Sequence, residues 1–437
     1  MERQLSENRF VFTDLHLGEG KNNNLDYFSA DEEFLKCISL IIDKYALSET
    51  PTELVLGGDT FDFLTVSYDW VEKNRKGQDV QKSRTLAEPT EEASLQKIRK
   101  IFDAHPKAIE ALKLFLKHGK IKFFIGNHDI SLAWPGVQTF IKEELAKELD
   151  PTEKRSALER ISFAFKEKKC RVLFEHGNDC EPHCAMPKKI FLEQRLGQPL
   201  EKPLLNHPYG NHLLEIANRL ATDTFWCKGN PWIGRLEPHW YVYLQSILDI
   251  RLKSFLKNWW FAIYAIATWL IAPFRHRFSR RWWVRKEHSF FKLFSFNLQA
   301  MLTTVLNKIR GQDSVYYFRE LLKHNDDIDI IVSGHLHEHH QETTRHGTYI
   351  NPGGWCESNR ASFPPPKLTW RRFRRVEKFF KYIWTVRKLF HKKTRDQFLP
   401  KKCEVFGIVV CRFYNDEHKE VELMRYNPEK NCLEKLN

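Results

Sequence analysis

One unit recurs along the chain: a short apolar run followed at once by a tight polar turn. The turns contain Asp, Asn or His, and most also contain Gly. Five apolar runs fit this description, at residues 9–13, 53–56, 121–125, 171–175 and 328–333. Short continuous apolar runs bounded by Gly and polar residues are typical of buried strands. The pattern therefore predicts five buried strands, each ending in a polar turn.

Helical patterns lie between these strands. Residues 30–44 place Phe34, Ile38 and Ile41 on one face, and residues 108–117 precede the third strand in the same way. Strands that alternate with helices favour an α/β fold, in which functional sites form beyond the carboxyl ends of the strands. We therefore expect the five polar turns to meet at that edge.

Two long segments interrupt the pattern. Residues 182–311 are rich in Trp, Phe, His and Arg and show helical spacing, and a second interruption begins at the triple proline of residues 364–366. Strand-like runs return at 405–413 and 421–426. The sequence therefore predicts one sheet domain with two insertions. Its parts are 1–181 (core, first part), 182–311 (helical insertion or cap), 312–363 (core, second part), 364–402 (basic amphipathic helical insertion) and 403–437 (C-terminal strands that complete the core).

The two insertions share an aromatic and basic chemistry. Residues 259–272 are apolar except for Thr268 and have basic borders; as a helix they would span about 21 Å, less than the roughly 30 Å hydrocarbon core of a bilayer. Residues 371–395 contain eleven Lys or Arg and one acid, Glu377. Such segments are typical of helices that lie in a membrane interface. They also fit helices packed on the protein's own core, a single membrane span, or a surface that binds nucleic acid.

The composition narrows the class of protein. The 437 residues include 69 Lys and Arg against 56 Asp and Glu, a formal charge of +13, and the segment 371–395 contributes +10 of it (eleven minus one). Hydrophobic residues make up 42% and charged residues 29%, which excludes a mostly disordered chain and a polytopic membrane protein.

The nine scattered Cys favour a reducing compartment over a disulfide framework. The N-terminal residues lack the apolar core of a signal peptide. We expect a cytoplasmic protein with peripheral contact to the inner face of the membrane.

The polar turns supply a set of candidate metal ligands. The set is Asp14, His16, Asp59, Asn127, His176, His335 and His337. Oxygen and imidazole donors without Cys suit Mn, Fe, Zn or Ni. They are numerous enough for two metals that share one carboxylate, and two such metals about 3.5–4 Å apart can hold a phosphate and activate a water molecule. Asp59, in a Gly-Gly-Asp turn, fits the shared position. Each turn alone would more often be solvated or capping, but five in a row at strand ends argue against that interpretation.

The order of these turns resembles a known family. Asp-x-His at 14–16, Gly-Asp-x-x-Asp at 58–62, Gly-Asn-His-Asp at 126–129, His-Gly at 176–177 and Gly-His-x-His at 334–337 are similar to the motifs of the calcineurin-like metallophosphoesterases. The resemblance covers residues 8–180 and 312–356, and residues 349–355 also look like a turn of that family. It implies an α/β fold with four layers (αββα), in which two sheets form a sandwich between helices.

The resemblance also implies roles for individual residues. Asp14, His16 and His337 would hold one metal; Asn127, His176 and His335 would hold the other; and Asp59 would bridge them. His128 would sit by the phosphate and help stabilise or protonate the leaving oxygen. Asp129 would accept the other N–H of that imidazole, and Asp62 would order the ligands or face the substrate. The implied cofactors are two divalent metal ions, with Mn expected first. The implied reaction is hydrolysis of a phosphodiester or diphosphate bond by a metal-bridging hydroxide.

Within that superfamily, residues 14–18 and the helix around 31–35 look like the UDP-2,3-diacylglucosamine pyrophosphatase branch. Those enzymes cleave a lipid-sugar nucleotide at the membrane and carry a helical insertion. The chain departs from them at His128, where the branch typically has Arg, and in its longer first insertion and its second insertion. The predicted substrate is therefore a phosphorylated amphiphilic small molecule, lipid- or sugar-nucleotide-like, at a membrane surface.

Two other classes remain open. The motifs at 58–62 and 126–129 also resemble the double-strand-break repair nucleases of the superfamily, and the basic aromatic insertions would then hold DNA or RNA. Those nucleases carry a coiled-coil or partner-binding region, whereas this chain has no sustained heptads. A scaffold that has lost its metals is disfavoured, because every ligand position is filled. The sequence indicates no protein partner. Residues 180–184 (CEPHC) are interpreted as a loop beside the active site rather than a structural zinc site.

Overall fold

The structure is a computed structural model. It describes residues 4–181, 184–211, 214, 236–237, 315–356, 359–360 and 405–436, apart from short gaps at 21–25, 48–49, 75–76, 86, 196–197, 209 and 416–417. The predicted segments 259–272 and 371–395 lie outside these residues. The chain divides into two compact units, residues 1–186, 316–357 and 402–437 in the first and residues 187–315 and 358–401 in the second.

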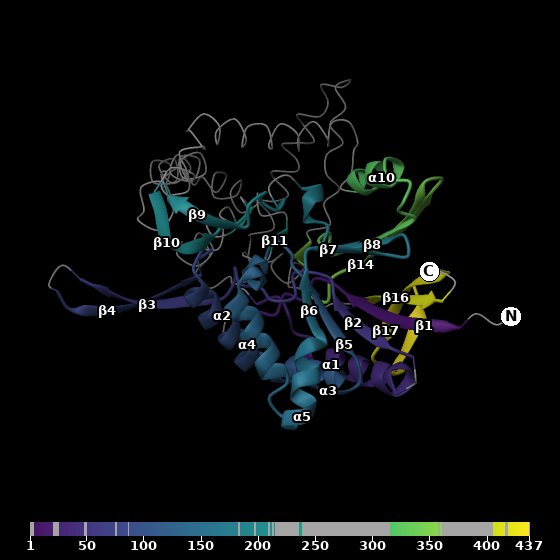
Figure 1. Cartoon of the computed structure of the whole chain (residues 1–437), viewed down its shortest axis with the longest axis horizontal. Coiled ribbons are helices and arrows are strands. Elements are labelled where there is room, and N and C mark those ends of the chain that lie inside the picture. The colour runs from purple at the N-terminus through teal and green to yellow at the C-terminus, as the bar shows by residue number, and fades with distance from the viewer. Residues whose placement is uncertain are drawn as a thin grey trace, which may run out of the picture. The chain divides into compact units, whose positions relative to one another are not determined.

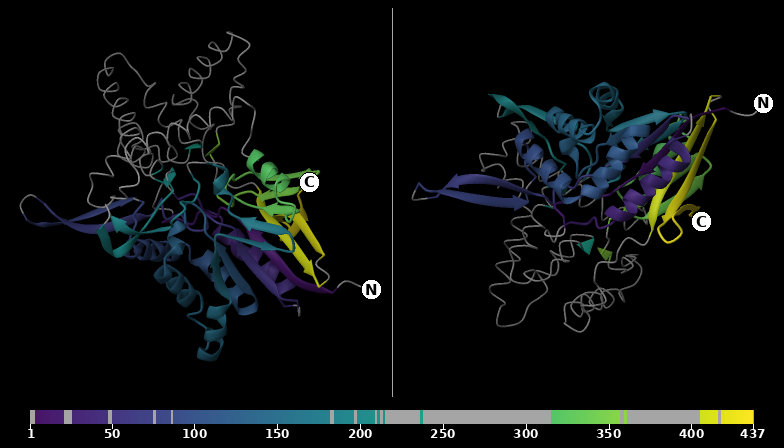
Figure 2. Two further views of the ribbon diagram at one scale, coloured as in Figure 1. Left: turned by 45° about the horizontal axis from the view of Figure 1, so that its top comes forward. Right: turned by 90° about the horizontal axis from the view of Figure 1, so that it is seen from below.

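The first unit contains two mixed sheets. The larger sheet has seven strands, in the order β18 (Cys432–Lys435), β17 (Lys419–Asn427), β16 (Phe406–Tyr414), β1 (Leu5–Phe12), β2 (Thr52–Leu56), β5 (Lys120–Phe124) and β6 (Ile161–Ala164). The smaller sheet has five, in the order β13 (His339–Thr344), β14 (Gly347–Pro352), β12 (Ile330–Val332), β8 (Val172–Glu175) and β7 (Lys166–Lys169). The five predicted strands are confirmed as β1, β2, β5, β8 and β12. The C-terminal strands join the larger sheet, with β16 antiparallel to β1, as Figure 2 shows.

The two sheets pack face to face around an apolar core. Val11, Val55 and Phe124 of the larger sheet and Val172 and Ile350 of the smaller one belong to the same cluster and are at most 2% exposed. Burial of each such side chain stabilises the folded state by roughly 1.5–3 kcal/mol relative to leaving it exposed to water. This shared core fixes the two sheets against each other and aligns the ends of their strands.

Helices cover the outer faces of both sheets (Figure 1). The helices on the side of the larger sheet are α1 (Asp31–Ile41) with the π-helical turn η1 (Ile42–Ala46), α2 (Glu91–Ala104), α3 (Pro106–His118), α4 (Pro135–Leu145) and α5 (Pro151–Glu159). α1 places Phe34 on the sheet, with its ring centroid 5.5 Å from that of Phe12. On the smaller sheet, α10 (Tyr316–Lys323) stacks Phe318 on Tyr349 of β14 at 4.2 Å. The predicted four-layer αββα arrangement is confirmed.

A buried ionic cluster is centred on Arg9 of β1. Arg9 pairs with Glu53 at 2.7 Å, with Glu7 at 2.5 Å and with Glu167 at 3.1 Å, and its side chain is only 4% exposed. Lys122 of β5 pairs with Glu53 at 3.3 Å and with Glu167 at 2.5 Å. The cluster thus links three neighbouring strands of the larger sheet to β7 of the smaller one.

Other strands lie outside the two sheets. A hairpin of β3 (Ser67–Lys73) and β4 (Asp79–Thr85) extends away from them (Figures 1 and 2). In the second unit, β9 (Phe191–Arg195) pairs with β10 (Gln198–Leu205), and β11 (Leu236–Glu237) pairs with β15 (Asn359–Arg360). The prediction of a helical segment from residue 182 was therefore wrong for 191–205. Two prolines and short alternating runs hide this hairpin in the sequence.

No helix within the described ranges combines the length and the hydropathy that a membrane span requires.

Candidate metal centre

The candidate ligands follow the carboxyl ends of strands from both sheets. Asp14 and His16 come after β1, Asp59 after β2 and Asn127 after β5, while His176 follows β8 and His335 and His337 follow β12. Backbone hydrogen bonds join neighbouring turns: Asp14 N–H donates to Gly58 O at 3.1 Å, and His16 N–H to Asp59 O at 2.9 Å. Gly334 N–H donates to His176 O at 2.9 Å in the smaller sheet. The turns are therefore held to one another as well as to their strands.

The backbone of these turns is strained at the candidate ligands. Eight described residues other than Gly have positive φ, and five of them are candidate ligands, with φ between 49° and 69°: Asp14, His16, Asp59, His335 and His337. Such conformations cost of order 1–3 kcal/mol each and persist where the surroundings enforce them, often at functional sites. The strain is thus concentrated where the side chains converge.

Two glycines allow the close approach of these turns. A Cβ at Gly126 would overlap the Asp59 carboxylate, and a Cβ at Gly58, which has φ +97°, would overlap the His176 ring. The Gly in Gly-Gly-Asp and in Gly-Asn-His-Asp is therefore required by packing against candidate ligands, and not only by the turn itself.

Asp59 occupies the middle of the cluster. Its Oδ2 lies 3.1 Å from His176 Nε2 and 3.8 Å from His16 Nε2, and its Oδ1 accepts the backbone N–H of His128 at 2.8 Å. Donor atoms of Asp59, His176 and His335 lie within 4.8 Å of one another, as do those of Asp59, His16 and His128. Asp59 therefore belongs to both donor groups, which is the arrangement expected of a bridging carboxylate.

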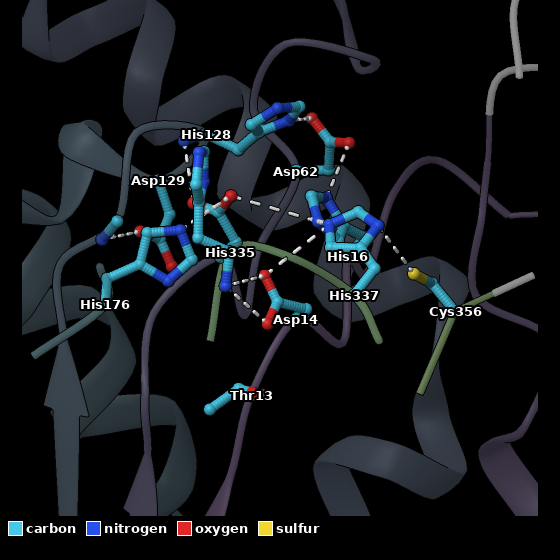
Figure 3. A network of polar contacts seen from close by, with 12 residues as sticks. Thr13, Asp14, His16, Asp62, His128, Asp129, His176, His335, His337 and Cys356 are labelled. Carbon is cyan, nitrogen blue, oxygen red and sulfur yellow. Dashed lines mark hydrogen bonds and ion pairs between the residues drawn. The ribbon is translucent and has the colours of Figure 1, made fainter. Parts of the chain in front are cut away.

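The first predicted ligand set comes together on one side of Asp59 (Figure 3). The Nε2 atoms of His16 and His337 lie 3.1 Å apart, and His337 Nε2 lies 3.5 Å from Asp14 Oδ1. The Asp14 carboxylate also accepts the backbone N–H of His335, at 2.9 and 3.0 Å to its two oxygens. Two imidazole nitrogens and a carboxylate thus face one small volume.

Two members of the second predicted set, His176 and His335, lie on the other side. The ring centroids of His176 and His335 are 5.3 Å apart, and His176 Nδ1 contacts the carbonyl oxygen of Gly57 at 3.2 Å. That contact leaves Nε2 of His176 directed to Asp59. Asn127 is 3% exposed and lies in the same turn as His128. The structure therefore brings the strand ends of both sheets to one centre.

The partner of the His128 ring differs from the prediction. Asp129 was expected to accept its second N–H, but the oxygens of Asp129 accept the backbone N–H groups of Gly126 at 2.6 Å and Thr60 at 2.8 Å. Instead, His128 Nδ1 pairs with Asp62 Oδ1 at 3.0 Å. Asp129 is turned into the protein, where it satisfies two turn N–H groups that would otherwise be buried without an acceptor.

Asp62 contacts two imidazoles at once. Its second oxygen lies 3.1 Å from His16 Nδ1, and the residue is fully buried. Of the two roles predicted for Asp62, this geometry fits the ordering of ligands. A carboxylate on Nδ1 fixes the ring so that Nε2 faces the cluster.

Three neighbours of the centre were not among the predicted ligands. Cys356 Sγ lies 3.8 Å from His337 Nδ1, and Glu181 Oε2 lies 3.6 Å from His335 Nε2. Cys184 Sγ lies 3.8 Å from Glu181 Oε2. The Cys-rich loop at 180–184 was the only sequence signal for the last two. Cys356 directly follows the turn at 349–355.

The electrostatics of the cluster favour bound cations. Burial alone would lower the pKa of His176, but the Asp59 carboxylate outweighs it and raises that pKa to about 9. Burial acts likewise on His128, where Asp62 and Asp59 raise the pKa to about 9. Burial would raise the pKa of Asp59, yet His176, His128 and His16 hold it well below its usual range. The carboxylates thus retain their charge and draw protons, or metal ions in their place, to the imidazoles.

Metal affinity is expected to depend on pH through His176. Its Nε2 must be free of a proton to bind a metal, and its pKa is raised to about 9. Below that pH a metal ion has to displace the proton, so the apparent affinity should rise with pH, by about tenfold per unit for each proton displaced, and level off above about 9. Titration of the metal-free protein with Mn²⁺ from pH 6 to pH 9 would measure this, and a flat or falling affinity would contradict it.

The chain resembles a few solved structures at low sequence identity. No family model matches the sequence, and no curated protein is similar to it. Among solved structures, the chain is similar to a dimetal phosphatase from Danio rerio, with 9% identity and a TM-score of 0.26 over 80% of this chain and 88% of that one. A 5′-nucleotidase from Staphylococcus aureus shows 11% identity and a TM-score of 0.26 over 95% and 52%. The phosphopantetheinyl hydrolase from Mycobacterium tuberculosis shows 12% and 0.21 over 80% and 91%. The chain spans about half the length of the 5′-nucleotidase.

Proposed function

We propose that the chain is a dinuclear-metal-dependent phosphoesterase that hydrolyses a phosphodiester or diphosphate bond. The observation that carries this proposal is the position of Asp59, with one carboxylate oxygen 3.1 Å from His176 Nε2 and 3.8 Å from His16 Nε2. Asp59 thus lies between two groups of imidazole donors. A carboxylate in that position can bind a metal ion in each group, as a two-metal centre requires.

The donor set fits two divalent metal ions. Carboxylate, amide and imidazole donors suit Mn, Fe, Zn or Ni, and the glycine backbones leave no room for other side chains between the turns. The first metal would be held by Asp14, His16 and His337, the second by Asn127, His176 and His335, and both by Asp59. When bound, two such ions supply an activated water and offset charge on the phosphate.

His128 is suited to act on the leaving group. Its pairing with Asp62 holds the ring in place, and its side chain is 17% exposed whereas that of Asp62 is fully buried. Burial lowers the pKa of His128, but the Asp62 and Asp59 carboxylates outweigh it and raise that pKa to about 9, so the ring of the metal-free protein carries a proton at neutral pH. It can therefore donate that proton to the departing oxygen, as a general acid does.

Asp62→Asn should test this positioning. An amide has one acceptor oxygen and no charge, so it cannot accept from both imidazoles or stabilise the charged His128 ring. We therefore expect kcat/KM to fall by roughly 10–100-fold, the usual loss when a partner of a metal ligand is changed. Loss of the general acid should affect substrates with a poor alcohol leaving group more than aryl phosphodiesters. Steady-state kinetics on both substrates would measure the difference.

The matched control is Asp329→Asn, at an exposed carboxylate that pairs with Arg171 on the surface. It should leave both rates near those of the wild-type enzyme. An equal loss on the two substrates in Asp62→Asn would count against a role for His128 as the acid.

We further propose that the substrate is amphiphilic. It is supported by the sequence of the apolar segment 259–272 and of the basic segment 371–395, which lie outside the described residues. Each basic residue near an anionic leaflet contributes about 1 kcal/mol to the free energy of membrane binding.

The experiment is an activity panel with Mn²⁺ and purified full-length chain, with Asp59→Asn as the inactive control. The substrates are an aryl phosphodiester, a nucleotide-diphosphate lipid and single-stranded DNA. We expect release from the phosphodiester and the lipid diphosphate. Rapid release from DNA alone would replace this proposal by the nuclease alternative, and release from none of the three would contradict a phosphoesterase.

A further inference from the structure

A second cluster of donor atoms lies beside the dinuclear set. Glu181, Cys184 and His335 each offer one atom, and these atoms lie within 4.8 Å of one another. Glu181 Oε2 is 3.6 Å from His335 Nε2 and 3.8 Å from Cys184 Sγ. The Glu181 side chain is 50% exposed and that of His335 is 9% exposed. The cluster therefore reaches solvent through Glu181.

The loop that carries Glu181 and Cys184 is built into the fold. It follows β8 through the short 3-10 turn η3 (Asn178–Cys180). The buried Asn178 donates its side-chain N–H to the carbonyl oxygen of Cys184 at 2.7 Å, and Cys184 N–H donates to Glu181 O at 2.9 Å. Asp179 accepts the backbone N–H of Met186 at 3.0 Å. These bonds fix the backbone of the loop, and the Cys184 thiol lies 3.8 Å from the Glu181 carboxylate.

The donor types in this cluster differ from those of the dinuclear centre. One sulfur, one imidazole nitrogen and one carboxylate oxygen suit Zn²⁺ or Cd²⁺, whereas Mn²⁺ and Mg²⁺ favour oxygen donors. Three protein ligands leave one position of a tetrahedral ion for water or solute. Cys356, near the other histidine of Gly-His-Leu-His, contacts Nδ1 of His337 instead, which is the nitrogen turned away from His16 and Asp14.

We propose that Glu181, Cys184 and His335 form a third cation site, selective for thiophilic divalent ions such as Zn²⁺ and Cd²⁺. His335 also belongs to the donor group of Asp59 and His176. Occupancy of the third site therefore competes with the second metal for this imidazole, and excess zinc inhibits the Mn²⁺-loaded enzyme. The inhibitory part rests on the proposed phosphoesterase function; the site itself does not.

The first test is a Cd²⁺ titration of the metal-free full-length chain, read by the ultraviolet absorption of cadmium-bound thiolate. Four proteins are compared: wild type, Cys184→Ser, Glu181→Gln and the control Cys180→Ser, whose thiol lies in the same loop outside the donor group. We expect Cys184→Ser to lose the absorption of one thiolate. Glu181→Gln should keep all thiols but need about tenfold or more Cd²⁺ for half-saturation, in the range seen when metal sites lose a partner.

Two outcomes of the Cd²⁺ titrations would contradict the proposed site. Equal absorption in wild type and Cys184→Ser would remove the site. An equal loss in Cys180→Ser would show a different ligand set. Circular dichroism of each variant checks folding, and Glu181→Gln keeps the test valid if Cys184→Ser is unfolded, because an unchanged half-saturation in it also overturns the site.

The second test is inhibition of Mn²⁺-dependent hydrolysis by added Zn²⁺. Cys184→Ser should need at least about tenfold more Zn²⁺ for half-inhibition than wild type or Cys180→Ser, matching the shift in affinity expected for the site. Equal inhibition of all three would overturn the competition for His335. If the chain hydrolyses no phosphoester at all, the proposed function fails while the Cd²⁺ titration still decides whether the site exists.

Discussion

Asp59→Asn is expected to remove metal binding and activity together. The change keeps the shape of the side chain but removes the charge that two imidazole groups share, with Oδ2 at 3.1 Å from His176 Nε2. An amide cannot bridge two cations as a carboxylate does, so kcat/KM should fall by more than about 100-fold, beyond the loss typical of residues behind a metal ligand. Elemental analysis after gel filtration and steady-state hydrolysis of an aryl phosphodiester would measure both effects.

The control for this variant is again Asp329→Asn, which should keep two metals per chain and normal turnover. Asp59→Asn with near-wild-type turnover and two bound metals would show that Asp59 is not a bridging ligand. Loss of turnover with both metals retained would assign Asp59 a role in the reaction other than holding metal.

Arg9→Ala is expected to lower the free energy of unfolding more than any other substitution discussed. Arg9 is 4% exposed and pairs with Glu53, itself 8% exposed, and its guanidinium lies 5.3 Å and 5.5 Å from the ring centroids of Phe174 and Phe413. Removing it leaves buried carboxylates without their cation, which costs about 3–5 kcal/mol. Urea unfolding followed by circular dichroism would show the loss as a lower midpoint with an unchanged slope.

The comparison variant is Arg171→Ala, which breaks an exposed pair with Asp329 at 2.6 Å. Because water and salt screen that pair, its removal should change the unfolding midpoint far less. Equal midpoints for the two variants would show that the cluster around Arg9 contributes no more than a surface pair.

Much of the fold could be predicted because its signals are local. Buried strands need continuous apolar runs, and residues 121–125 or 328–333 show them clearly. The order of the sheet could not be predicted in the same way. β16 lies beside β1 although about 400 residues separate Phe10 from Val410 in the sequence, and only the packing of the shared core brings them together.

The candidate site, too, could be predicted only in part. Residue types and their order indicated the seven donors, because each follows a strand that ends at the same edge. Which carboxylate holds His128 depends on side-chain direction. Asp129 is next in sequence but points into the protein, and Asp62 reaches the ring from another turn, 66 residues away. The contacts of Glu181 with His335 join loops of two strands and have no local signal either.

Anomalous X-ray diffraction from crystals grown with Mn²⁺ would show directly whether two metal ions share Asp59. We expect two anomalous peaks about 3.5–4 Å apart, with Asp59 contacting both. Asp14, His16 and His337 would surround one peak, and His176 and His335 the other. Absence of both peaks, with Asp14, Asp59 and His335 directed into separate regions of solvent, would contradict it.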